Sequence, residues 1–165
     1  MTHLWRSRAC QTAALVLIQA VAGQAHAGCA VSSNGLAFGA YTPLTFASSL
    51  VSSTVDSMAT VSVNCDLASG LLGYTLKLGP SQTGNTINPR YLANASGGDP
   101  MAFNVYTDAS YSAVWGDGST GSIITHGLLN GTFQHTVYGR VPAGQSTLKA
   151  GSYSGSMTIT VTYNL

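Results

Sequence analysis

The chain has 165 residues, of which 45% are hydrophobic and only 7% are charged. This balance excludes an acidic or mixed-charge disordered tail, because disordered segments combine high charge with low hydrophobicity. The basic residues are too few to form a stripe for nucleic acid or a cationic face for anionic lipid. The sequence therefore predicts one folded domain with its own core and no nucleic-acid partner.

Residues 1–27 are predicted to be a cleaved secretory signal peptide. Arg6 and Arg8 precede an apolar run, and Ala25-His26-Ala27 has the small-x-small pattern of a cleavage site. The apolar run is short and interrupted by glutamines, so it does not suit a membrane span. A lipoprotein signal is the alternative, because Cys29 follows closely, but His26 stands where such a signal has leucine.

The mature domain is expected to cover residues 28–165, an exported segment without a membrane span. Four basic and five acidic residues give it a formal charge of −1. Its even pair of cysteines, Cys29 and Cys65, predicts a disulfide, because exported proteins fold in an oxidising compartment. Zinc binding is the alternative, but His126 and His135 lie at no recognised finger spacing from the cysteines. We therefore predict a disulfide, no metal and no cofactor.

Short runs typical of β-strands follow one another along this domain, separated by segments rich in Gly, Ser, Asn and Pro. No sustained helical periodicity interrupts them. In chain order, the expected strands lie at 29–38 with a bend at Asn34-Gly35, and at 58–65, 74–78, 101–106, 122–125, 132–138 and 152–165. About seven short strands at this spacing predict an all-β sandwich with Greek-key connections.

Two of these runs alternate cleanly between apolar and polar residues, which is the pattern of a strand with one buried face. In the run 58–65, Cys65 is on the apolar face, so we expect it to meet Cys29 across the sandwich. We expect the last strand to pair with an earlier strand or with another molecule, because an unpaired edge is a liability. Its apolar face carries Met157, Ile159, Val161 and Tyr163.

No catalytic pattern stands out, and we expect no enzyme. The sequence has neither H-E-x-x-H nor G-x-S-x-G, and a Ser-His-Asp set drawn from so many serines would carry no information. The segment 116–119 lacks the ligand spacing of a calcium loop and the lysine of a phosphate loop, so we interpret it as a tight turn. Tyr106, Tyr111 and Trp115 could form a sugar platform, but packing of Tyr106 and Trp115 at the sheet edge is the preferred interpretation.

Several segments, taken in order, resemble the spore coat protein U domain family, whose members are secreted subunits of archaic chaperone–usher pili and a spore coat protein. The opening from Cys29 through Leu36 and Phe38, and the strand that ends at Cys65, are similar to the family's cysteine strands. Gly155 departs from the pattern, because the family usually has aspartate there. The remaining matching positions are Trp115, Gly116, Asp117, Gly118, Tyr138, Gly139, Arg140, Pro142, Gly144, Gly151 and Tyr153.

The resemblance implies an incomplete immunoglobulin-like Greek-key sandwich that lacks its last strand. A periplasmic chaperone would lend a strand during transit, and an outer-membrane usher would pass the subunit to a neighbour whose N-terminal extension replaces that strand. The implied role is structural or adhesive, on a pilus or coat at the cell surface, in biofilm or surface attachment. The expected acceptor groove has Leu36 and Phe38 facing Met157, Ile159, Val161 and Tyr163.

Cys29 follows the predicted cleavage point by one residue, so we expect an acceptor without a donor arm, at a terminal position such as a tip. Two alternatives remain open. The protein could be a self-contained coat or matrix protein in which the region 116–124 fills the groove. It could also be a secreted carbohydrate-binding module that uses Tyr106, Tyr111 and Trp115.

Overall fold

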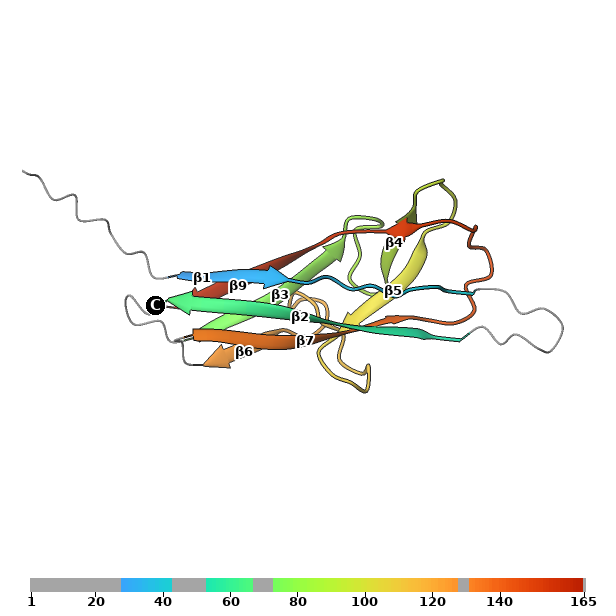
Figure 1. Ribbon diagram of the computed structural model, residues 1–165. Coiled ribbons are helices and arrows are strands. Elements are labelled where there is room, and N and C mark those ends of the chain that lie inside the picture. Colours follow the sequence, from blue (N-terminus) through green and yellow to red (C-terminus); the bar gives the residue numbers. More distant parts are fainter. Residues whose placement is uncertain (1–27, 43–52, 67–72, 128–130, 165) are drawn as a thin grey trace, which may run out of the picture.

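The computed structural model describes residues 28–42, 53–66, 73–127 and 131–164, which form two antiparallel β-sheets (Figure 1). The predicted signal peptide, residues 1–27, lies outside the described residues. The larger sheet has the strand order β1-β2-β7-β5-β4-β8, and the smaller has the order β6-β3-β9. The strands are β1 (Gly28–Ser33), β2 (Val55–Asp66), β3 (Gly73–Ser81), β4 (Arg90–Asn94), β5 (Met101–Tyr106), β6 (Ile124–Gly127), β7 (Gly131–Val141), β8 (Tyr153–Ser154) and β9 (Met157–Asn164).

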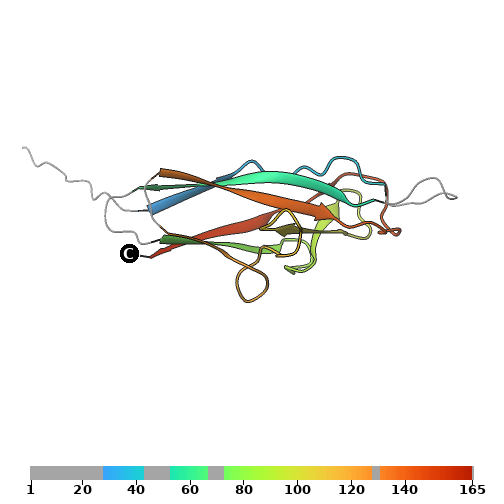
Figure 2. The same ribbon diagram turned by 90° about the horizontal axis from the view of Figure 1, so that it is seen from below.

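The two sheets lie over one another as two layers, with the apolar core between them (Figure 2). Val61 and Val63 of β2 point inward and are fully buried, while Ser62 between them faces outward, as period-2 alternation requires. Leu76 of β3 and Val105 of β5 complete the centre of this core. The predicted all-β fold is confirmed. No helix among the described residues is long and apolar enough to cross a membrane.

The strands differ most from the expected ones in three places. The first strand ends at Ser33 instead of continuing to residue 38, because Gly35 and Gly39 both have a left-handed φ of 72° and divert the chain from the ladder with β2. The strand β4 was not expected, because its buried positions Arg90 and Asn94 are polar. The C-terminal run is split into β8 and β9.

The disulfide joins Cys29 and Cys65, as predicted, but not across the sandwich. The two residues lie directly opposite one another on the neighbouring strands β1 and β2, with their Cα atoms 4.1 Å apart. Cys65 is buried, as its place on the apolar face indicated. The bridge therefore fastens the edge strand of the larger sheet to the strand beside it.

We expect the double substitution Cys29→Ala, Cys65→Ala to lower the free energy of unfolding by about 3–4 kcal/mol, because the crosslink restricts the unfolded chain over a separation of 36 residues. Urea unfolding of the oxidised protein and of the double variant measures the difference. The reduced wild-type protein should match the double variant. A difference below about 1 kcal/mol would contradict this role for the bridge.

Candidate functional site

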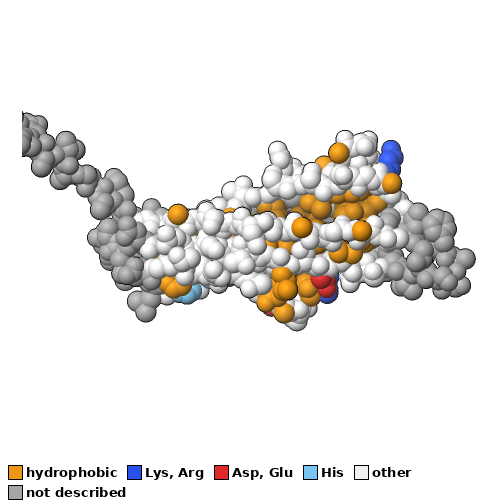
Figure 3. All heavy atoms as spheres, viewed as in Figure 1, with side chains coloured by type: hydrophobic (Ala, Val, Ile, Leu, Met, Phe, Trp, Pro, Cys, Tyr) orange, Lys and Arg blue, Asp and Glu red, His pale blue; other side chains and the backbone are white. Residues whose placement is uncertain are grey.

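A large groove opens along one side of the molecule, between the edges of the two sheets. There, β1 is the edge strand of the larger sheet and β9 is an edge strand of the smaller one. The groove has a volume of about 1060 Å³. Hydrophobic side chains are visible in a hollow on this face (Figure 3). A groove of this size with a largely apolar lining is unusual on a solitary soluble protein, and it indicates a binding surface.

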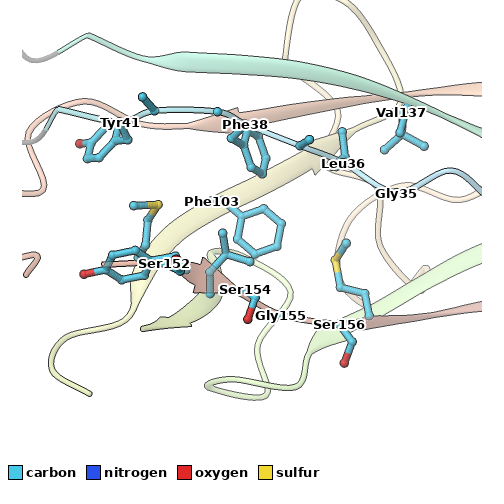
Figure 4. Close-up of a pocket in the computed structure, with 18 of the residues that line it drawn as sticks. Gly35, Leu36, Phe38, Tyr41, Phe103, Val137, Ser152, Ser154, Gly155 and Ser156 are labelled. Atoms are coloured by element: carbon cyan, nitrogen blue, oxygen red, sulfur yellow. The ribbon is translucent and has the colours of Figure 1, made fainter. Parts of the chain in front are cut away.

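The groove has two walls and an apolar floor. Residues 33–42 form one wall, and residues 148–157 with Ile159 form the other. Leu36 and Phe38 lie on one side of the groove, opposite the segment 154–156, with Phe103 of β5 between them (Figure 4). The rings of Phe38 and Phe103 meet edge to face at 5.8 Å, which joins the first wall to the floor.

Gly139 of β7 makes room for the first wall. A Cβ atom at this position would lie 2.9 Å from Phe38 Cζ and 3.0 Å from Leu36 Cδ1, closer than real contacts allow. The absence of a side chain therefore lets both residues pack onto β7. This contact gives a physical reason for the glycine at position 139, which the sequence alone identified only as a motif residue.

Part of the backbone along each wall is available for pairing. No described strand pairs with residues 35–42, which are held instead by side chains: Ser57 Oγ donates to Ala37 O at 2.8 Å, and Tyr41 Oη donates to Pro142 O at 2.9 Å. Within the described part of the chain, β9 pairs with β3 alone. An extended segment lying in the groove could therefore hydrogen-bond on both of its edges.

The structure brings four of the six expected groove residues together: Leu36, Phe38, Met157 and Ile159 line the groove. Val161 does not line it and packs half-buried against the core. The backbone of Tyr163 pairs with Tyr74, and its side chain lies outside what the structure describes. Lining residues that sequence reasoning did not assign to the groove include Tyr41, Leu92, Phe103, Leu148 and Gly155, together with the motif residues Trp115, Gly151 and Tyr153.

The segment that begins at Trp115 supports the fold and does not fill the groove. Trp115 is fully buried; its Nε1 donates to Leu76 O at 3.4 Å and its backbone N donates to Val105 O at 2.9 Å. The turn that follows is closed by Asp117, whose pKa is lowered by hydrogen bonds from the backbone of Thr120 and from the side chain of Ser119. Gly118 adopts a left-handed φ of 91° within this turn. Residues 116–124 do not line the groove, so they are not the internal filler considered above.

The burial of Trp115 also corrects a second expectation. A sugar platform needs an exposed ring, and no part of the Trp115 side chain reaches the surface. Tyr106 and Tyr111 are half-buried on the outer surface, with their rings edge to face at 5.5 Å. Trp115 therefore takes no part in a sugar platform, and the expectation that it does so is wrong.

The remaining motif residues hold loops and strand ends in place. Arg140 forms a bidentate ion pair with Asp56, at 2.6 and 2.8 Å, and the hydrogen bond from Arg140 lowers the pKa of that carboxyl group. Gly144 adopts a left-handed φ of 81°. A Cβ atom on Gly151 would lie 2.8 Å from Asn94 Oδ1, so glycine permits this close approach.

Two histidines meet between the sheets near the disulfide end of the strands. Tyr74 Oη and His135 Nε2 are 2.6 Å apart and share a hydrogen bond, and His126 packs on Phe133 with ring centroids 4.3 Å apart. Burial lowers the pKa of His135, and the nearby His126 lowers it further. Within the described ranges, no three His, Cys, Asp or Glu side chains gather closely enough to hold a metal ion.

We expect the protein to lose stability as the pH falls below about 6.5, the ordinary pKa of histidine. The unfolded chain then binds a proton at His135 before the folded chain does, so protonation favours unfolding. The free energy of unfolding of the His135→Gln variant should depend less steeply on pH between pH 7 and pH 5. Urea unfolding midpoints across this pH range measure this dependence. If the midpoint of the variant changed with pH as steeply as that of the wild type, the loss of stability could not be assigned to His135.

Comparisons with known proteins found one family and a similar solved structure. The Spore Coat Protein U domain matches residues 13–160 of the chain. A chain of the crystal structure of the CsuC–CsuE chaperone–tip adhesion subunit pre-assembly complex, from archaic chaperone–usher Csu pili of Acinetobacter baumannii, is similar over 82% of this chain and 39% of its own length. The sequence identity is 17% and the TM-score is 0.46. No curated protein matches the chain.

Proposed function

Because the chain belongs to the spore coat protein U domain family, we propose that it is a secreted, non-enzymatic surface subunit whose groove receives a β-strand from another protein. The observation that carries this proposal is the groove itself. Its floor is apolar, residues 35–42 pair with no described strand, and β9 pairs only with β3 among the described strands, so its other edge is open to a partner. A strand with alternating apolar side chains would place them on Phe103 and Ile159 while its backbone pairs with both walls.

The proposed order of partners follows from the exposed apolar surface. An unfilled groove would promote aggregation in the periplasm, so a periplasmic pilus chaperone would fill it first. An outer-membrane usher and neighbouring subunits would then take over, and the protein would reach the cell surface in a pilus or coat. The fold in this proposal is the incomplete immunoglobulin-like Greek-key sandwich, in which the groove is the place of the last strand.

Co-expression in the periplasm with and without a cognate pilus chaperone tests this function. We expect a soluble one-to-one complex with the chaperone, and little soluble chain without it. Equal yields of soluble monomer in both cases would contradict the proposal and favour a self-contained coat or matrix protein.

A further inference from the structure

A second surface, separate from the groove, shows features of a binding site. On the outer face of the larger sheet, Met58 of β2, Tyr106 of β5 and Tyr138 of β7 lie side by side in one row of the strand register. Tyr111, from the loop after β5, reaches over this row, and its ring lies edge to face with those of Tyr106, at 5.5 Å, and Tyr138, at 6.3 Å. We call these four residues the tyrosine platform; none of them lines the groove.

The loop that carries Tyr111 is held in a defined shape. The Asp108 carboxylate accepts backbone hydrogen bonds from Ser110 at 3.0 Å, Ser112 at 3.2 Å and Ala113 at 2.7 Å. Tyr111 itself has a left-handed φ of 58°, which is uncommon for an aromatic residue. A strained backbone at a half-exposed side chain that contributes nothing to the buried core points to a functional role.

The charges at the platform cancel one another. The Arg140 guanidinium lies 3.6 Å from the centroid of the Tyr111 ring, and the same guanidinium is bound by both carboxylate oxygens of Asp56. Neither charge is therefore free to select an ion of opposite sign. Met58 beside them is 68% exposed, which leaves an apolar surface with hydroxyl groups at its border.

A polar hollow lies farther along the same face of the sheet. It has a volume of about 400 Å³ and is lined only by neutral residues that bear hydroxyl or amide groups, including Thr60, Ser62 and Gln134. Thr60 follows Met58 by two residues on β2, so the hollow begins about 7 Å from the platform. The remaining lining residues are Ser32, Ser33 and Asn34.

The geometry points to a binding site for a neutral oligosaccharide or polysaccharide, formed by the tyrosine platform and the polar hollow beside it. The apolar faces of sugar rings suit the tyrosine rings and Met58, and sugar hydroxyls suit side chains that both donate and accept hydrogen bonds. An acidic glycan would need an unpaired cation, and the described residues of the platform and hollow provide none. A protein partner would favour a drier apolar centre than this hydroxyl-lined face offers.

A glycan array tests this inference, with the full chain applied both free and as its chaperone complex. The array includes neutral glycans of bacterial, plant and animal origin, which identifies the source, and acidic glycans for comparison. We expect binding to neutral glycans, with at least a tenfold loss of affinity in Tyr111→Ala and in Gln134→Ala. Tyr91→Ala, which removes a half-buried tyrosine outside the platform, the hollow and the groove, is the matched control and should bind normally.

Gln134 is exposed, so its substitution separates loss of binding from loss of folding. The inference would be overturned by no glycan binding of the wild-type chain, by binding to acidic glycans alone, or by neutral binding that both variants retain. Retention of a protein partner on the platform, with no glycan bound, would also overturn it. None of these outcomes depends on whether a chaperone fills the groove.

Discussion

Arg90→Met is expected to lower the free energy of unfolding by more than about 4 kcal/mol, enough to prevent accumulation of folded protein. Arg90 is completely buried, and burial lowers its pKa to about 10, so it stays charged at neutral pH. No carboxylate among the described residues hydrogen-bonds to it. Its guanidinium instead donates to the carbonyl groups of Leu78, Gly79, Ile87 and Trp115 and to Asn104 Oδ1.

Methionine has a similar volume but donates no hydrogen bond, so these acceptors would be buried without partners. Each buried acceptor left in this way costs about 1–3 kcal/mol. Arg90→Lys should be nearly as harmful, because an ammonium group cannot reach acceptors spread around a planar guanidinium. Two of the acceptors, on Leu78 and Trp115, belong to residues that line the groove, so Arg90 also holds the groove floor together.

Lys77→Met is the matched control, because Lys77 is on the outer face of β3 beside the buried Leu78 and its side chain forms no hydrogen bond within the described structure. We expect this change to shift stability by less than about 0.5 kcal/mol. Urea unfolding and periplasmic yield measure both variants. If Arg90→Met were as stable as Lys77→Met, the hydrogen bonds of the guanidinium would not contribute to stability in this way.

Ile159→Lys is expected to weaken capture of the protein by a pilus chaperone by about 100-fold, equivalent to about 3 kcal/mol of binding free energy. Ile159 lines the groove from β9, half-buried, at the wall opposite Leu36 and Phe38. A lysine there would place a charge against the apolar side chains of an incoming strand. The open groove lets the ammonium group reach water, so the folded chain should tolerate the change.

Thr158→Lys is the control, since Thr158 is the preceding residue of β9 and faces the opposite, exposed side. It introduces the same charge at nearly the same place in the chain. Pull-down of each variant with the chaperone, titrated for affinity, distinguishes them. Equal affinity of the two variants would mean that the strand binds elsewhere.

The sequence predicted the elements whose pattern repeats and missed those that depend on single contacts. Alternation along β2 and β9 identified the buried face of each strand, and the cysteine pair identified the disulfide. The same pattern identified Met157 and Ile159 as facing the groove. Placing Cys65 across the sandwich was wrong, because alternation gives the face of a residue but not its neighbouring strand.

Polar residues whose side chains are buried could not be predicted from the alternation of apolar and polar residues. Arg90 and Asn94 make β4 look like a loop, although both side chains are buried and hydrogen-bonded. Gly139 gave no local signal of its contact with Phe38, which comes from a segment 101 residues earlier in the chain. The sequence suggested Tyr106 and Tyr111 as part of a sugar platform, but it grouped them with Trp115 instead of Met58 and Tyr138. The loop shape that places Tyr111 over this row depends on the hydrogen bonds of Asp108.

Site-specific photo-crosslinking tests most directly the central claim that the groove receives a strand. A photoreactive residue at Ala37, exposed on the groove wall, should form a covalent adduct with the co-expressed chaperone. The same residue at Gln134, exposed on the outer face of the larger sheet, should form none. An adduct at position 134 without one at position 37, or no adduct at position 37 while the complex forms, would contradict the account.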